Sequence, residues 1–156
     1  MDKMVFISNM QRLDKAYPPK IPLNKVQLQE KVNFWYEYFA DCKEKIFEQA
    51  VTNYIKHEEF PPSIAGVMKY YREIETYLKE MREFLFSQYS MMMATWDENQ
   101  DQDTLNEFVR IIRKYPREKK KEAAIEITNK AISYHHDCEY EGRTAPSLLE
   151  YLRGVK

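Results

Sequence analysis

The sequence predicts an all-α protein, and three observations indicate this fold class. Only three glycines occur in 156 residues, whereas average usage of roughly 7% would give about eleven. Such scarcity disfavours turn-dense β structures and glycine-rich phosphate loops. Apolar residues recur at helical spacing through most of the chain. The prolines fall between these periodic segments, where they end one helix or begin the next.

Three helices are predicted in the first 57 residues. The first covers residues 2–16 and ends at the prolines of residues 17–22, which cannot continue a helix. Asn24 can cap a second helix, which ends near residue 39. A third covers residues 42–57 and carries a wide apolar stripe. The core residues expected from this half include Val26, Leu28, Trp35, Tyr36, Phe39, Phe47, Tyr54 and Phe60.

A fourth and much longer helix is predicted from residue 62 to about residue 94. Pro62 suits its first turn, and Ser63 can accept hydrogen bonds from the exposed amides there. The helical period persists without another proline, which gives about 30 residues, or roughly 45 Å. Because such a rod outruns one small core, we expect its distal half to link two units or to pack on a partner.

Three shorter helices are expected in the rest of the chain. Residues 97–107 are acidic and polar, and they predict a loop that ends at an N-cap near Asp103. Helices follow from there, from Pro116 and from Ser147.

The fold expected is therefore a small helical bundle with a long connecting helix and a second helical unit. Residues 1–75, 76–96 and 97–156 are the three parts. Phe34–Val51 aligns without gaps on Phe108–Ile125. A degenerate internal repeat is one interpretation of this alignment, and chance similarity between helix-turn-helix patterns is the other.

Composition limits the class of protein. The 24 Lys and Arg nearly balance the 25 Asp and Glu, so there is no overall attraction to nucleic acid or membrane. No apolar run approaches the roughly 18 residues of a membrane span, and the start does not resemble a signal peptide. Cys42 and Cys138 are too few for a disulfide scaffold. We expect a cytoplasmic protein.

No catalytic or cofactor motif is recognised. His135–Glu139 is the only crowd of metal-ligand types, but adjacent helical residues point about 100° apart and do not chelate one ion. Neither cysteine lies in a nucleophile motif, and no phosphate loop is present. We expect no enzyme activity, no metal and no cofactor.

The strongest local charge lies between residues 110 and 121. Seven basic residues occur in twelve positions, with Glu118 the only acid: Arg110, Arg113, Lys114, Arg117, Lys119, Lys120 and Lys121. This segment could contact nucleic acid in a salt-dependent way. Pairing with the acidic residues of 97–107 is the other interpretation.

Four landmarks in the first half resemble the N-terminal domain of phage replicative helicase loader/inhibitor proteins. They are Tyr17-Pro18, Trp35-Tyr36, the helix around Ala50-Val51, and Phe60-Pro61-Pro62-Ser63-Ile64-Ala65. The resemblance covers about residues 1–70. It implies a phage or prophage protein that acts by contact with the replicative helicase or its loader. The family's C-terminal region is more flexible, whereas the second half here is apolar enough to fold.

A partner-binding surface is expected on the long helix and the C-terminal half. Methionines and aromatic rings gather near its distal end on more than one face, which is typical of an adaptable binding surface or of a buried helix. The binding residues predicted are Tyr89, Met92, Met93 and Trp96, with Arg113, Arg117 and Lys120 as steering charges. A nucleic-acid-binding module and an inhibitor of a host defence protein are the alternatives, and the oligomeric state is open.

Overall fold

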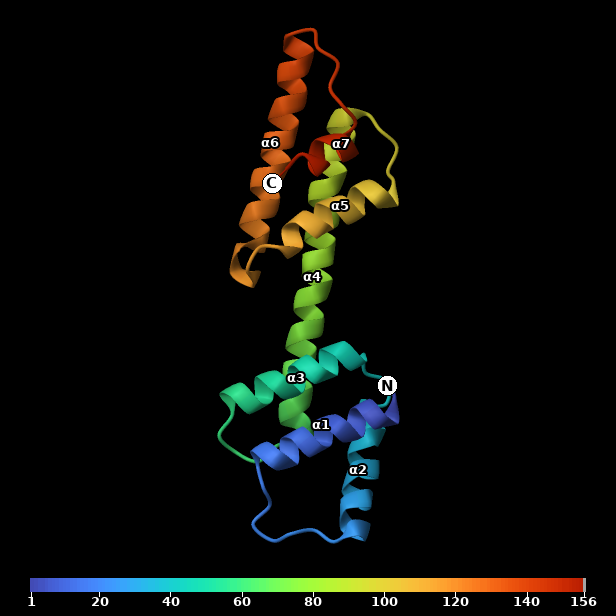
Figure 1. Cartoon of the computed structure of the whole chain (residues 1–156), viewed down its shortest axis with the longest axis vertical. Helices are drawn as coiled ribbons and strands as arrows, with labels where there is room; N and C mark the ends of the chain where they lie inside the picture. The colour runs from blue at the N-terminus through green and yellow to red at the C-terminus, as the bar shows by residue number, and fades with distance from the viewer. Residues whose placement is uncertain (156) are drawn as a thin grey trace. The chain divides into compact units, whose positions relative to one another are not determined.

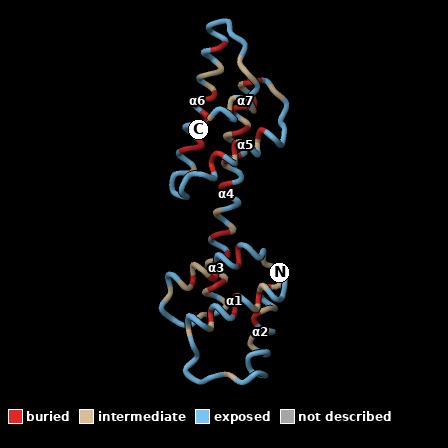
Figure 2. Tube along the Cα trace, viewed as in Figure 1, coloured by how far each residue is buried: buried red, intermediate tan, exposed pale blue. Residues whose placement is uncertain are grey.

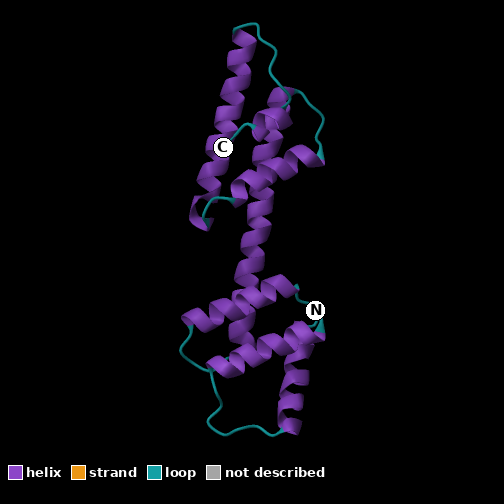
Figure 3. Ribbon diagram, in the orientation of Figure 1, coloured by secondary structure: helices purple, strands orange, loops and turns teal. Residues whose placement is uncertain are grey.

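The computed structural model describes residues 1–155, which form seven α helices and a short 3-10 helix (Figure 1). No strand occurs among these residues (Figure 3), so the all-α prediction is confirmed. The chain divides into two compact units, Met1–Leu78 and Lys79–Lys156. The long helix α4 contributes residues to both of them.

The N-terminal unit contains three helices and the first turns of a fourth. Asp2 caps the first helix by accepting from the amides of Met4 and Val5. Asn24 and Gln27 form a reciprocal capping box at the second. The bounds are α1 Lys3–Ala16, α2 Lys25–Phe39, α3 Glu44–His57 and α4 Ile64–Trp96.

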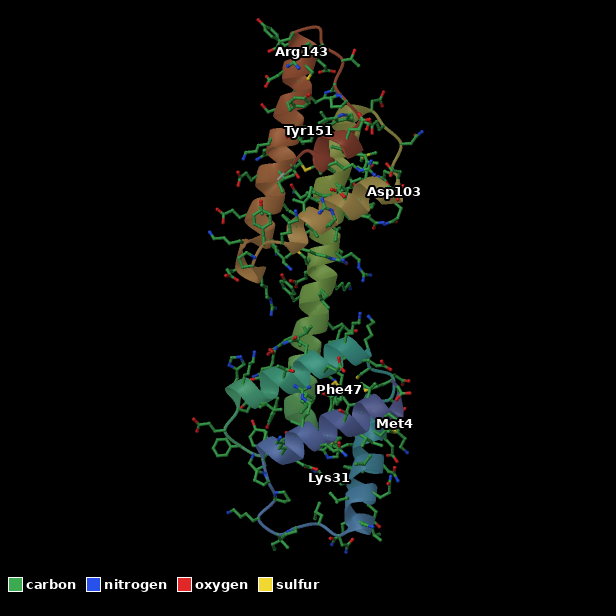
Figure 4. The ribbon with its side chains drawn as sticks, in the orientation of Figure 1. Met4, Lys31, Phe47, Asp103, Arg143 and Tyr151 are labelled. Atoms are coloured by element: carbon green, nitrogen blue, oxygen red, sulfur yellow. The ribbon has the colours of Figure 1, made fainter. Side chains whose placement is uncertain are left out.

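Aromatic packing forms the core of the N-terminal unit. The Phe47 ring, labelled in Figure 4, lies 5.5 Å from that of Phe6 and 4.9 Å from that of Phe39. Trp35 lies 6.1 Å from Phe39 and is also buried. The placement of these residues in the core is confirmed. The same expectation for Phe60 is wrong, because its ring lies in the loop before α4 and is 74% exposed.

Gly66 in the first turn of α4 has no room for a side chain. An added Cβ would lie 2.7 Å from Cε2 of Tyr54, whose hydroxyl hydrogen bonds the Pro61 carbonyl. Gly66→Ala should therefore destabilise the N-terminal unit by about 1–3 kcal/mol, as overpacking does. Urea unfolding followed by Trp35 fluorescence, in a Trp96→Phe background, measures the loss.

Relief of the same clash provides the control for Gly66→Ala. Tyr54→Leu removes the ring that the new methyl group meets. The double variant should then be less destabilised than the sum of the two single variants. Additive losses would show that Tyr54 does not impose glycine at residue 66.

The C-terminal unit is built from residues 79–96 of α4 and four further elements. Asp101 caps α5 by accepting from the amide and hydroxyl of Thr104, and these hydrogen bonds lower the pKa of its carboxyl group. The cap therefore lies two residues before the expected Asp103. The bounds are α5 Gln102–Arg113, η1 Arg117–Lys119, α6 Lys120–Tyr140 and α7 Leu148–Arg153.

The core of the C-terminal unit draws on every α helix of the unit (Figure 2). Residues 79–96 supply six buried side chains, so this part of α4 belongs to that core. The separate connecting element over residues 76–96 stays a prediction. The buried apolar residues include Met81, Leu85, Tyr89, Met92, Met93, Trp96, Phe108, Ile111, Ile112, Ala124, Ile127, Ala131, Leu148 and Leu152.

Burial does not follow the gap-free alignment of the two halves. Phe34 is 53% exposed, whereas its counterpart Phe108 is fully buried. Phe39 is fully buried, whereas its counterpart Arg113 is exposed. The alignment thus pairs core positions with surface positions.

Candidate protein-binding surface

A surface cavity of about 630 Å³ lies in the N-terminal unit, between the end of α2 and the first turns of α4. Apolar side chains and three charged ones line it. We call it the α2–α4 groove, and its residues are Tyr38, Ile64, Ala65, Met68, Lys69, Arg72 and Glu73.

Two exposed rings extend the apolar character of this groove along α2. Phe34 and Tyr38 are 53% and 52% exposed. They are four residues apart and face each other edge-on, with ring centroids 5.4 Å apart. Because Trp35 and Phe39 point into the core, Phe34 and Tyr38 form a second apolar stripe that no described residue of the unit covers. Paired exposed rings beside a cavity are typical of interaction surfaces.

Tyrosine hydroxyls hold the loop that leads into α4. Tyr17 donates to the Glu58 carbonyl oxygen at 2.6 Å, and Tyr70 donates to the Glu58 carboxylate at 2.9 Å. The latter hydrogen bond is the main reason that the pKa of Tyr70 is raised. Tyr54 donates to the Pro61 carbonyl oxygen. Fixing this loop fixes the start of α4, and hence the position of Ile64 in the groove.

A smaller cavity of about 350 Å³ lies between α1 and α2. Leu28 and Val32 contribute apolar surface to it, and the adjacent Lys31–Asp14 ion pair spans 2.5 Å. Leu28 and Val26 were expected in the core, but they are 39% and 66% exposed. That expectation is wrong, because the first turns of α2 carry no buried residue.

The expectation that Tyr89, Met92, Met93 and Trp96 are exposed is also wrong. All four are at most 8% exposed within the C-terminal unit. The Tyr89 hydroxyl donates to the Asp101 carbonyl and accepts from the Asp101 amide. Trp96 Nε1 donates to the Pro146 carbonyl at 2.9 Å. These polar contacts and the apolar packing make them core residues, and their role in binding stays a prediction.

The three predicted steering charges lie at or near the surface. Arg113 and Arg117 are exposed and Lys120 is half-buried. Of the basic segment, Arg110 pairs with Glu107 and Lys119 pairs with Glu122. The acidic residues before α5 thus neutralise only part of the basic segment.

Sequence reasoning overlooked Phe34 and Tyr38. A signal for them was present, since Phe34 to Phe39 contains five apolar residues where a helix in one small core can bury only some. Among the described residues, no group of three His, Cys, Asp or Glu side chains could hold a metal ion. None of the described helices has the length and apolar character needed to cross a membrane.

The fold and the groove define a small all-α domain with an aromatic core and an exposed apolar face. Comparison with protein-family models matched residues 1–68 to the N-terminal domain of the phage helicase loader/inhibitor family. The N-terminal unit therefore belongs to this family, as the sequence landmarks predicted. Comparisons with curated proteins and with solved structures gave no match.

Proposed function

We propose that the protein binds a component of the replication machinery, the replicative helicase or its loader, and modulates or inhibits it without catalysing a reaction. The observation that carries this proposal is the α2–α4 groove with its exposed pair of rings, Phe34 and Tyr38, in a domain of the helicase loader/inhibitor family.

The groove has the composition of a protein interface centre. Aromatic rings and methionine are enriched in such centres, and a few of them dominate the binding energy. Tyr38 and Met68 supply such groups. Lys69, Arg72 and Glu73 supply charges that can select and orient a partner segment. An apolar partner side chain that enters the cavity would meet the Tyr38 ring.

The groove requires less rearrangement than the surface predicted from the sequence. Binding through Met92 or Trp96 would require the core of the C-terminal unit to open, since both are buried. The rings of Phe34 and Tyr38 are already exposed. The groove is therefore the better candidate.

Capture from host lysate followed by direct binding tests the proposal. The full chain should retain a helicase or loader, identified by mass spectrometry. The double variant Phe34→Ser/Tyr38→Ser should bind that purified partner at least about tenfold more weakly, since loss of one hot-spot residue costs more than about 1–2 kcal/mol.

Phe86→Ser is the matched control, because Phe86 is 47% exposed in the C-terminal unit. It should bind as the wild type does. Equal affinity of the wild type and the double variant would exclude the groove as the binding site. Capture of another protein alone, such as a host defence protein, would overturn the target.

A further inference from the structure

The turn between α5 and α6 carries cations that have no ion-pair partner within the described chain. No ion pair engages Arg113, Lys114, Lys120 or Lys121 within residues 1–155. The Lys121 ammonium lies 5.6 Å from the centre of the Phe84 ring. We call these four residues the basic turn. Its charge is complementary to a polyanion.

Exposed and half-exposed tyrosines adjoin the basic turn. Tyr115 lies within it in sequence and is 36% exposed. The pKa of the Lys130 ammonium on α6 is raised, first by its hydrogen bond to Glu126 and the charge of that carboxylate. The nearby hydroxyls of Tyr115 and Tyr151 raise this pKa further. Both tyrosines therefore lie close to Lys130.

The aromatic surface continues from Tyr151 to a third ring. Tyr151, labelled on α7 in Figure 4, has its ring centroid 4.9 Å from that of Tyr134 on α6. Both side chains are partly exposed. Tyr115, Lys130, Tyr151 and Tyr134 thus form a row in which one cation stands among three rings, and we call it the tyrosine strip.

We propose that the C-terminal unit binds single-stranded nucleic acid, with phosphates at the basic turn and unpaired bases on the tyrosine strip. Single-strand binding surfaces combine cations that follow the backbone with rings on which successive bases stack. A duplex would satisfy the cations but would hide its base faces from the rings. An acidic protein would use the cations alone. This activity goes beyond the proposed function, which rests on the N-terminal unit.

Fluorescence anisotropy with the full chain tests the proposal. The probes are a labelled oligothymidylate and a labelled oligouridylate of about 20 nucleotides, which exceeds one site of roughly 4–16 nucleotides, together with a duplex of the same length. At about 50 mM salt at least one single strand should bind more tightly than the duplex, and binding should weaken at about 200 mM. No binding of either single strand at the lower salt would overturn the proposal.

Two sets of variants separate the cations from the rings. Replacing the four residues of the basic turn by Gln should weaken single-strand binding at least about tenfold and reduce the slope of log K against log salt by about 3. Tyr115→Ala should weaken binding about fivefold to a hundredfold, because each stacked base is worth about 1–3 kcal/mol. Tyr115→Phe should retain binding.

The controls use exposed residues of the same types elsewhere. Tyr140→Ala, at a residue 93% exposed, and Lys45→Gln/Lys56→Gln on α3 should bind as the wild type does. Circular dichroism should show every variant folded. Equal binding of single strand and duplex with no effect of Tyr115→Ala would overturn the proposal, as would displacement of the probe by an equal concentration of polyglutamate. The groove variant Phe34→Ser/Tyr38→Ser should keep nucleic-acid binding, so failure here is distinguishable from failure of the proposed function.

Discussion

Phe47→Ala should lower the free energy of unfolding of the N-terminal unit by about 3–5 kcal/mol, the usual cost of truncating a buried phenylalanine. Phe47 is fully buried, and its ring packs against Phe6 and Phe39 from two other helices. Removing the ring leaves a cavity at the point where α1, α2 and α3 meet. Because stabilities of small domains are only about 5–15 kcal/mol, the variant should be close to unfolding at room temperature.

Urea unfolding of Phe47→Ala can be read from Trp35, the only tryptophan of this unit, in a Trp96→Phe background. Phe34→Ala is the matched control, since the same ring is removed from a position that is 53% exposed. The control should change the free energy of unfolding by less than about 0.5–1 kcal/mol. Equal losses in the two variants would contradict the aromatic core.

Met92→Ala should destabilise the C-terminal unit by about 2–5 kcal/mol, as truncation of a buried methionine does. The neighbouring Met91→Ala should change stability by less than about 0.5 kcal/mol, because a substitution on the surface removes little packing. Met92 is fully buried and Met91 is 48% exposed. The two variants thus have the same chemistry and adjacent positions, but opposite environments.

Trp96 fluorescence in a Trp35→Phe background reports unfolding of the C-terminal unit, since Trp96 is its only tryptophan. A large loss in Met92→Ala and none in Met91→Ala would assign Met92 to the core. The reverse order would mean that this face of α4 is turned outward, as the sequence analysis expected.

The helices were predictable because helix signals are local. Proline at residues 18, 19, 22, 61 and 62 marks where helices stop and start, and the apolar period between them persists for many turns. The cap of α5 was misplaced because Asp101 and Asp103 are equally good caps by residue type. Only the hydrogen bonds from Thr104 identify Asp101.

The candidate site was less predictable because exposure is not local. Apolar residues on more than one face of α4 fit a surface helix that binds a partner and a helix covered on several sides by its own chain. In the structure, Met92 and Trp96 follow the second case. Conversely, Phe34 belongs to an aromatic run that suggests a core, and only the packing of Trp35 and Phe39 turns it outward.

The second half of the chain differs from what the family resemblance implies. The family match ends at residue 68, and the resemblance implies a more flexible region beyond the N-terminal domain. Residues 79–155 instead form a helical unit with its own core. This supports the expectation that the second half folds. It also provides a surface, the basic turn and tyrosine strip, that is separate from the α2–α4 groove in sequence.

Hydrogen–deuterium exchange of the full chain, with and without the captured helicase or loader, tests the central claim most directly. The α2–α4 groove predicts that the partner slows exchange at residues 34–40 of α2 and its C-terminal end and at residues 64–73 of α4. Slowed exchange confined to α1, α3 or the C-terminal unit, with these two segments unchanged, would contradict the groove as the docking site.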